Sequence, residues 1–284
     1  MADISLTAGM RQNLYSMQRT AKLMDRTAGR LSSGYKVETA LDDPINYFAA
    51  EGHRQRATDL ASRKDEMGEA IQLVKAGNNG IEAVTDLVAS AKSLAQSALS
   101  ADTSAEIRSL ESQYNALRTQ INQLSDDAGY KGVNLMDGTD DTLKVSFDEK
   151  GQASVTLTGF DGSATGLGMT SVSDSTWVDG GTAASDSAKG NASNINIDIG
   201  KLDSARTTLR SEAKTLADKL STITIRQDFT SNMINTLNDG ADNLTLADMN
   251  EEGANMLMLQ TRQGLGTSSL SMASQAAQSV LRLF

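Results

Sequence analysis

The feature of this sequence that most constrains its fold is a seven-residue apolar repeat close to the N-terminus. Apolar or small residues recur there at alternating intervals of four and three positions. The repeat comprises Met10, Leu14, Met17, Ala21, Met24, Ala28 and Leu31. A helix with this spacing carries one continuous apolar stripe, which it buries against another helix. The N-terminal segment is therefore predicted to form one half of a coiled coil.

The C-terminal segment carries a looser form of the same repeat. Met258, Leu265 and Met272 are spaced by seven, as are Ser269, Ala276 and Leu283, and Val280 lies beside them. Neither terminal segment has a core of its own, so we expect each to pack against the other or against a neighbouring molecule. The residues predicted to carry this packing are Met10, Leu14, Met17, Met24, Leu31, Met258, Leu265, Met272, Val280 and Leu283.

The residues after the first stripe predict a helix end followed by a new helix. Gly34 follows Leu31, Ser32 and Ser33, and glycine can end a helix because it adopts the left-handed conformation at low cost. A short connector then leads to Asp42-Asp43-Pro44, where an aspartate can cap a helix whose first turn holds the only proline.

Two further helices are expected between residues 45 and 127. Residues 45–100 carry two adjoining apolar stripes, so this helix should contact two partners. The stripes contain Leu60, Met67, Ile71, Val74, Ile81 and Val88, and then Leu73, Val84, Leu87, Ala91 and Leu94. Residues 104–127 supply one partner, with Thr103 or Ser104 as the expected cap and Glu106 in the first turn.

The middle of the chain changes from a helical period to a period of two. Alternating residues at 143–147 and 153–157 flank a polar turn, which predicts a β-hairpin at about residues 143–157. Residues 159–193 are rich in Gly, Ser, Thr, Asp and Ala, and predict irregular structure at the surface. Heptad spacing returns from about 199 to 238, and Asn238-Asp239-Gly240 is expected to interrupt it before a final helix. The predicted fold class is mainly α, with long antiparallel helices, a coiled coil and a small β-hairpin and loop region.

Composition argues against most binding and catalytic classes. Aromatic residues make up only 4% of the chain, whereas ligand pockets are usually richer in them. The formal charge of -10, without a basic cluster, argues against nucleic-acid binding. The chain contains no cysteine, which removes disulfides and thiolate chemistry. No stretch reaches the roughly 20 apolar residues of a membrane span, and residues 1–30 lack the pattern of a secretory signal.

No residue pattern predicts a catalytic, cofactor or metal site, so the chain is expected not to be an enzyme. The single histidine, His53, has no second His or Cys to complete a metal site and is expected at the surface. The glycine-rich stretch 159–168 lacks the Lys of a phosphate loop, and the acidic stretch 137–141 lacks calcium-loop spacing.

The Ser- and Thr-rich stretch is a candidate region for O-linked glycosylation, given its expected exposure. The candidate positions are Ser163, Thr165, Thr170, Ser171, Ser173, Ser175, Thr176 and Thr182.

With these residues in view, the chain resembles bacterial flagellin, the subunit of the flagellar filament. The most specific match is the sequence Arg-Leu-Ser-Ser-Gly at 30–34 followed by Ala-Leu-Asp-Asp-Pro at 40–44. Supporting matches are Gly-Val-Asn-Leu-Met-Asp-Gly at 132–138 and the segment from Ser268 to Leu283. The resemblance covers about residues 1–140 and 195–284.

The resemblance implies a division of the chain into four parts. These are a terminal coiled-coil filament-core domain (1–33 with 251–284), a connector (34–44), a helical rod domain with the hairpin (45–160 with 198–250), and a short variable surface region (161–197).

The resemblance also implies a function and a set of partners. The expected function is a structural subunit that self-assembles into a helical homopolymer for swimming motility. Expected partners are other copies of the chain, the hook-associated junction and cap proteins, a flagellar export chaperone and the type III export apparatus, without nucleic acid or membrane insertion. The expected location is the extracellular flagellum, reached without a cleaved signal peptide.

Three alternatives remain open from the sequence. A hook-filament junction protein shares the terminal domains and the Asp-Asp-Pro motif, and is the second candidate. A receptor signalling coiled coil should carry a membrane span and uninterrupted heptads. An enzyme in the middle of the chain would need a convergent set of polar residues.

The small residues of the terminal stripes predict that the end helices are marginally stable alone. Each fully buried Met or Leu contributes only about 1.5 to 3 kcal/mol, whereas ordering the backbone costs about 1 to 2 kcal/mol per residue. We therefore expect the ends to become ordered when subunits stack, so that folding of the ends and polymerisation are coupled.

Overall fold

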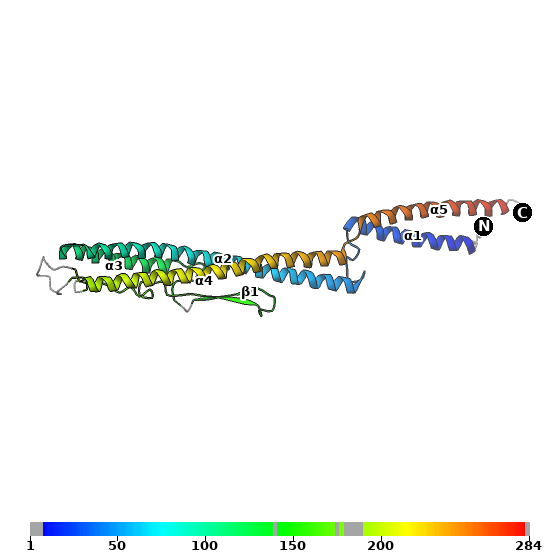
Figure 1. Ribbon diagram of the computed structural model, residues 1–284. Coiled ribbons are helices and arrows are strands. Elements are labelled where there is room, and N and C mark those ends of the chain that lie inside the picture. The colour runs from blue at the N-terminus through cyan, green and yellow to red at the C-terminus, as the bar shows by residue number, and fades with distance from the viewer. Residues whose placement is uncertain (1–7, 139–140, 174–175, 179–189, 282–284) are drawn as a thin grey trace. The chain divides into compact units, whose positions relative to one another are not determined.

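The computed structural model describes residues 8–138, 141–173, 176–178 and 190–281, and Figure 1 labels its helices and the strand β1. The elements within these ranges are α1 (Ala8–Ser33), α2 (Pro44–Leu99), α3 (Ser104–Asp127), β1 (Thr142–Ser146), β2 (Ser154–Thr158), α4 (Ala192–Thr245) and α5 (Met249–Leu281). The predicted mainly α class with a small hairpin is confirmed.

The chain divides into two compact units. A terminal unit comprises Met1–Ala57 and Asn235–Phe284, and a central unit comprises Thr58–Ile234. The helices α2 and α4 each contribute residues to both units. The four-part division expected from the family resemblance stays a prediction.

In the terminal unit, α1 and α5 pack side by side in opposite directions (Figure 1). Asn13 of α1 donates a hydrogen bond to the carbonyl of Gly266, and Arg30, near the other end of α1, contacts Glu252. On α5 the residues that are buried or half-buried against this partner include Glu252, Met256, Leu259, Gln263 and Gly266. These positions alternate by four and three, as a coiled-coil seam does. We call this face of α5 the inner seam.

The connector between α1 and α2 pairs with the segment between α4 and α5. The amides of Lys36 and Val37 donate to the carbonyl of Thr245 at 2.8 and 3.2 Å, and the amide of Ala247 donates to the carbonyl of Gly34 at 2.9 Å. Gly34 has a φ of 79°, the left-handed conformation that ends α1. The predicted helix end near residue 33 and restart at Pro44 are both confirmed.

Two aspartates fix the start of α2. Asp43 Oδ1 accepts hydrogen bonds from the amides of Ile45 and Asn46, each at 3.1 Å, as a capping residue does. Asp42 Oδ2 accepts from the amide and the hydroxyl of Thr39, each at 3.0 Å. These bonds from Thr39, joined by a weaker one from Glu38, hold the pKa of Asp42 below its usual value.

The predicted interruption of the last helical region at residues 238–240 is wrong. α4 continues through Gly240 to Thr245, and α5 begins after Asp248, whose Oδ1 accepts from the amides of Asn250 and Glu251. Leu237 and Ala241 are buried on either side of Gly240, so tertiary packing outweighs the weak helix propensity of Asn, Asp and Gly there. α4 also begins at Ala192, earlier than the predicted start near residue 199, because Asn191 caps it and Ile195 is buried.

The core of the central unit lies among α2, α3 and α4. From α4 it contains Ile195, Leu202, Leu209, Leu216 and Ile223, each spaced by seven and at most 4% exposed. From α3 it contains Ile107, Tyr114 and Ile121, again spaced by seven. α3 occupies the predicted residues 104–127, and Thr103 is its cap.

The hairpin and the following loop also pack into the central core. β1 and β2 are antiparallel, with Val145 opposite Val155 and Leu143 opposite Leu157. Val145 and Leu157 are buried, as are the loop residues Leu167, Met169 and Trp177. The described part of the loop after β2 therefore belongs to the hydrophobic core.

Candidate self-assembly surface

The outer face of α5 carries a second apolar stripe beside the inner seam. Met258, Leu265 and Met272 are 58%, 68% and 62% exposed, and Leu257 beside them is 67% exposed. The seven-residue spacing places Met258, Leu265 and Met272 on one face of the helix. We call these three residues the outer stripe. Ordinary soluble surfaces rarely leave such a row of large apolar side chains without a partner.

The predicted packing residues of α1 are only partly covered. Met10, Met17, Met24 and Leu31 are half-buried, whereas Leu14 is 39% exposed. Two residues that the apolar repeat did not single out, Thr20 and Thr27, are buried on this helix. Thr20 and Thr27 are spaced by seven, so they form a second heptad series beside the apolar one. A search for apolar residues alone misses this series because threonine is polar.

The pairing of α1 with α5 combines a few apolar contacts, such as the buried Leu259, with small and polar residues. Arg30 forms an ion pair with the buried Glu252 at 2.6 Å. Met17 packs beside Gly266, where an added Cβ would lie 3.0 Å from Met17 Cγ. A glycine, two buried threonines and an ion pair bury less apolar area than a seam of leucines would. Intramolecular pairing therefore leaves much of the apolar surface of both helices exposed.

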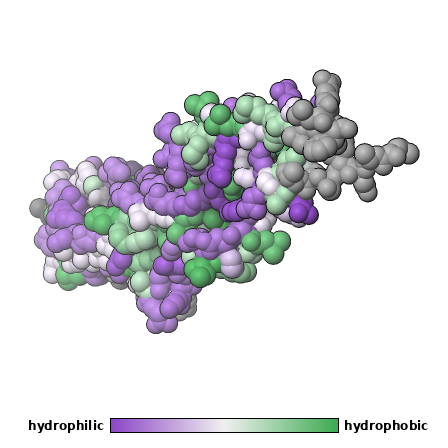
Figure 2. All heavy atoms as spheres, turned by 90° about the vertical axis from the view of Figure 1, so that its right-hand side faces the viewer, coloured by the Kyte–Doolittle hydropathy of each residue, from purple (hydrophilic) through white to green (hydrophobic). Residues whose placement is uncertain are grey.

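A third exposed apolar group lies where the connector meets α2. Leu41 is 96% exposed, Ile45 is 82% exposed and Phe48 is 65% exposed. The ring of Tyr47 packs edge-on against Phe48, with ring centroids 5.5 Å apart. Figure 2 shows apolar side chains, in green, reaching the surface between hydrophilic ones on the face that it presents. This group lies outside the apolar repeats predicted to carry packing, although Leu41, Ile45 and Phe48 are spaced by four and three.

Two predicted packing residues cannot be placed. Leu283 lies outside the described residues, and for Val280 the structure describes the helix but not the side chain.

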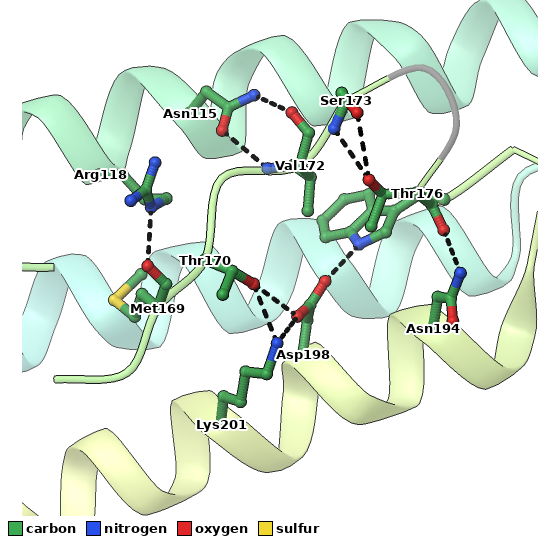
Figure 3. Close-up of polar contacts among 11 residues, drawn as sticks. Asn115, Arg118, Met169, Thr170, Val172, Ser173, Thr176, Asn194, Asp198 and Lys201 are labelled. Atoms are coloured by element: carbon green, nitrogen blue, oxygen red, sulfur yellow. Dashed lines mark hydrogen bonds and ion pairs between the residues drawn. The ribbon is translucent and has the colours of Figure 1, made fainter. Parts of the chain in front are cut away.

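The loop after β2 is held to α3 and α4 by a polar network (Figure 3). The Trp177 Nε1–H donates to Asp198 Oδ2 at 2.8 Å, and Lys201 Nζ lies 3.0 Å from Asp198 Oδ1. The Asn115 side chain donates to the carbonyl of Val172 at 2.6 Å and accepts from its amide at 3.2 Å. Because Trp177 and Asp198 are both buried, we interpret this network as fixing the described part of the loop to α3 and α4.

The candidate glycosylation residues differ in whether their hydroxyl groups already form hydrogen bonds. Ser163 Oγ accepts from the amide of Gly166, Thr170 Oγ1 bonds to Asp198, and Thr176 Oγ1 accepts from the amide of Ser173. Thr165 and Ser171 are exposed, and their hydroxyl groups bond to no other residue that the structure describes. Ser175 and Thr182 lie outside the described residues.

The structure brings no metal-type cluster together in the part of the chain that it describes. His53 is half-buried on α2, where its imidazole lies near Gly240 of α4. In the described residues, no helix has the length and apolar character that crossing a bilayer requires.

Comparison with known proteins gives the same family at both ends of the chain. Residues 4–141 match the bacterial flagellin N-terminal helical region, and residues 199–284 match the bacterial flagellin C-terminal helical region. The chain belongs to the bacterial flagellin family. Members of this family are structural subunits of the flagellar filament, and the chain is therefore assigned to the filament and to motility.

Individual flagellins align along nearly the whole chain. Flagellin FljM of Caulobacter vibrioides is 28% identical, with 99% of this chain and 98% of that protein covered. A flagellin of Brucella melitensis is also 28% identical, with 100% and 99% covered. The crystal structure of Bacillus cereus flagellin aligns with a TM-score of 0.46 at 15% identity, covering 58% of this chain and 88% of that one.

Proposed function

We propose that the chain polymerises through the exposed apolar residues of α1 and α5, and that these helices become fully ordered only in the filament. The observation that carries the proposal is the outer stripe of α5, which the intramolecular pairing with α1 leaves exposed. A second copy that covers the stripe would gain about 1.5 to 3 kcal/mol for each large apolar side chain that it buries. The three stripe residues are among the ten assembly residues that the sequence predicts.

Assembly of this kind is head-to-tail. A stripe on one face of α5 that meets a different surface on the next copy gives a heterologous contact, which generates an open helical array instead of a closed ring. The exposed group of Leu41, Ile45 and Phe48 supports such an array, since it offers a further apolar surface for a neighbouring copy.

Coupling between ordering and assembly follows from the composition of the inner seam. Gly266, Gln263 and the Arg30–Glu252 ion pair contribute little apolar burial, whereas each ordered residue costs about 1 to 2 kcal/mol of backbone entropy. Free monomers should therefore open the α1–α5 pair readily. The same property would let the chain pass through a narrow export channel before it locks into place at the filament tip.

We further propose the partners that the family resemblance implies. These are the type III export apparatus, an export chaperone that covers the C-terminal helix before assembly, and the junction and cap proteins at the two ends of the filament. The exposed outer stripe supports a chaperone role, because apolar helices of this kind need cover in the cytoplasm. An extracellular filament location and the absence of enzymatic activity belong to the same proposal.

O-linked sugars, if the source organism adds them, should attach at Thr165 and Ser171, the exposed candidates with unengaged hydroxyl groups. Intact-mass measurement of native filaments tests this modification, and a mass equal to that of the bare polypeptide would reject it.

Limited proteolysis tests the coupling between ordering and assembly. We expect a protease to remove about residues 1–40 and 250–284 from monomers and to spare them in filaments. Equal protection of these segments in both states would contradict the proposal.

Electron microscopy after salt-induced assembly distinguishes a filament subunit from the second candidate, a hook-filament junction protein, because a junction protein alone should not form long filaments.

A further inference from the structure

A cavity of about 280 Å³ lies between α1 and α5, and an arginine from each helix lines it. Arg19 of α1 and Arg262 of α5 line it together with Tyr15 and Leu23 of α1. Among the residues that the structure describes, none that lines this cavity is acidic. In the described ranges, neither guanidinium group has an ion pair or a hydrogen bond to another residue. Two cations that share a concave site without a counter-charge repel each other, and an added carboxylate would relieve that repulsion.

The rim of the cavity is suited to a helix that carries both an acid and apolar residues. Tyr15 is 65% exposed and Leu23 is 44% exposed, on either side of Arg19. α1 is also basic within an acidic protein of net charge -10, since its only acidic residue is Asp25. Its cationic residues are Arg11, Arg19, Lys22, Arg26 and Arg30. An acidic, partly apolar partner therefore complements this surface.

The outer stripe of α5 has these two properties. Glu251 lies seven residues before Met258, so it shares the face of Met258, Leu265 and Met272. Glu251 is exposed, and its carboxylate forms no ion pair with a residue that the structure describes. Glu251 also lines a neighbouring cavity of about 290 Å³. Three cationic side chains (Arg26, Arg30 and Lys36) and five carboxylates line that cavity, so negative charge remains in excess there.

We propose that the cavity between α1 and α5 receives the carboxylate of Glu251 from a second copy of the chain, while that copy's outer stripe packs on Tyr15 and Leu23. The inference rests on the proposed self-assembly and specifies one of its contacts. An arginine–carboxylate pair is directional, because the planar guanidinium can donate two parallel hydrogen bonds to one carboxylate. The pair would thus set how neighbouring subunits are aligned, which apolar packing alone leaves loosely defined.

Charge reversal tests the contact in the full-length chain. Arg262→Glu and Glu251→Arg should each raise the critical concentration for filament formation by about tenfold or more, because like charges then face each other across the contact. Arg262→Lys should have a smaller effect. Lys214→Glu reverses an exposed charge on α4, outside both terminal helices, and serves as the matched control, with assembly close to that of the unmodified chain.

Mixing the two reversed variants gives the decisive result. Arg262→Glu chains still carry Glu251, which fits the unchanged cavity of Glu251→Arg chains. In return, the arginine introduced at position 251 fits the cavity that Arg262→Glu has made acidic. We therefore expect the equimolar mixture to form filaments at concentrations where each variant alone does not. Failure of the mixture, or an equal loss of assembly in Lys214→Glu, would overturn the inference.

The outcome for the unmodified chain separates this inference from the proposed function. If the unmodified chain forms filaments and Arg262→Glu forms them equally well, self-assembly stands and only the arginine–glutamate contact is rejected. If the unmodified chain forms no filaments under any salt condition, the proposed self-assembly fails first. Circular dichroism of each variant checks that the helices are retained.

Discussion

At the residue scale, Asp198 accepts from three neighbours at once. Its carboxylate accepts from Trp177 Nε1 and Thr170 Oγ1 and pairs with Lys201, although the side chain is only 3% exposed. A buried carboxylate is tolerated when its lone pairs are used in this way. Asp198 thus connects the loop after β2 to α4 through the only tryptophan of the chain.

Replacement of Asp198 tests that role. Asp198→Ala leaves the Trp177 N–H buried without its acceptor, and should lower the free energy of unfolding by about 1 to 3 kcal/mol. Asp198→Asn keeps an oxygen acceptor and should cost less. Tryptophan fluorescence during urea unfolding measures both, since Trp177 is the sole indole. Equal stability of Asp198→Ala and the unmodified chain would show that the network contributes nothing.

Tyr114 gives the molecule a dependence on alkaline pH. Its side chain is fully buried and packs on Trp177, with ring centroids 5.1 Å apart, and no described residue bonds its hydroxyl. Burial, and then the negative charge of Asp198, raise the pKa of Tyr114 to about 12 from 10.0. The neutral phenol is therefore favoured in the folded state, and the unfolded chain releases this proton first as pH rises.

The sign of the pH effect follows from this order. The contribution of Tyr114 is intact below pH 10 and is lost as pH rises from 10 to 12, which lowers the free energy of unfolding by about 2 to 3 kcal/mol. Tyr114→Phe should remove that part of the pH dependence and leave stability at neutral pH equal or higher, since it deletes a buried hydroxyl without a partner. Unfolding curves at pH 8, 10 and about 12 compare the two chains, and identical slopes against pH would refute the assignment.

At the scale of the elements, one glycine of α2 sets how closely other segments approach that helix. An added Cβ at Gly80 would lie 2.6 Å from Met136 Sδ and 2.8 Å from Ala128 Cβ, atoms that belong to the segment after α3. An added Cβ at Gly200 of α4 would have no atom of another segment within 4 Å. Both glycines lie inside helices, where alanine has the higher intrinsic propensity.

These two glycines make a matched pair of substitutions. Gly200→Ala should stabilise the chain by about 0.4 to 1 kcal/mol, because it reduces the entropy of the unfolded state. Gly80→Ala should destabilise it by about 1 to 3 kcal/mol, because overpacking at Met136 and Ala128 exceeds the gain in propensity. Thermal unfolding followed by circular dichroism measures both. A stabilising Gly80→Ala would mean that Met136 moves aside at little cost.

At the scale of the whole molecule, assembly depends on what the chain leaves uncovered. The inner seam of α5 holds α1 through residues such as Glu252 and Gly266, and the outer stripe stays available. Large apolar side chains more than half exposed on a helix of this length reduce solubility unless another surface covers them. We expect neighbouring copies in the polymer to cover these side chains.

Leu265→Asp tests the outer stripe directly. The substitution places a charge at an apolar contact between copies and should abolish filament formation, or raise its critical concentration by more than tenfold. Gln260→Asp adds the same charge to α5 outside the stripe and should assemble normally. Sedimentation of filaments and electron microscopy measure both variants. Normal assembly of Leu265→Asp would exclude the stripe from the interface.

Local sequence signals determined the course of the helices and the hairpin. Gly34 and the Asp43–Pro44 start, the Thr103 cap, and the alternation around residues 143–157 all act within a few residues of the chain, and each is confirmed by the structure. Such signals are readable because they depend on backbone conformation and on nearby hydrogen bonds.

Only the tertiary structure decided which faces are buried. Periodicity shows that Met258, Leu265 and Met272 share a face, yet Glu252, Leu259 and Gly266 share another, and α1 pairs with the second. The uninterrupted α4 at Gly240 and the burial of Trp177 beside Asp198 likewise depend on contacts between distant residues. A repeat of seven fixes which side chains lie together on a helix, whereas the choice between two such faces depends on the shape and charge of the partner helix.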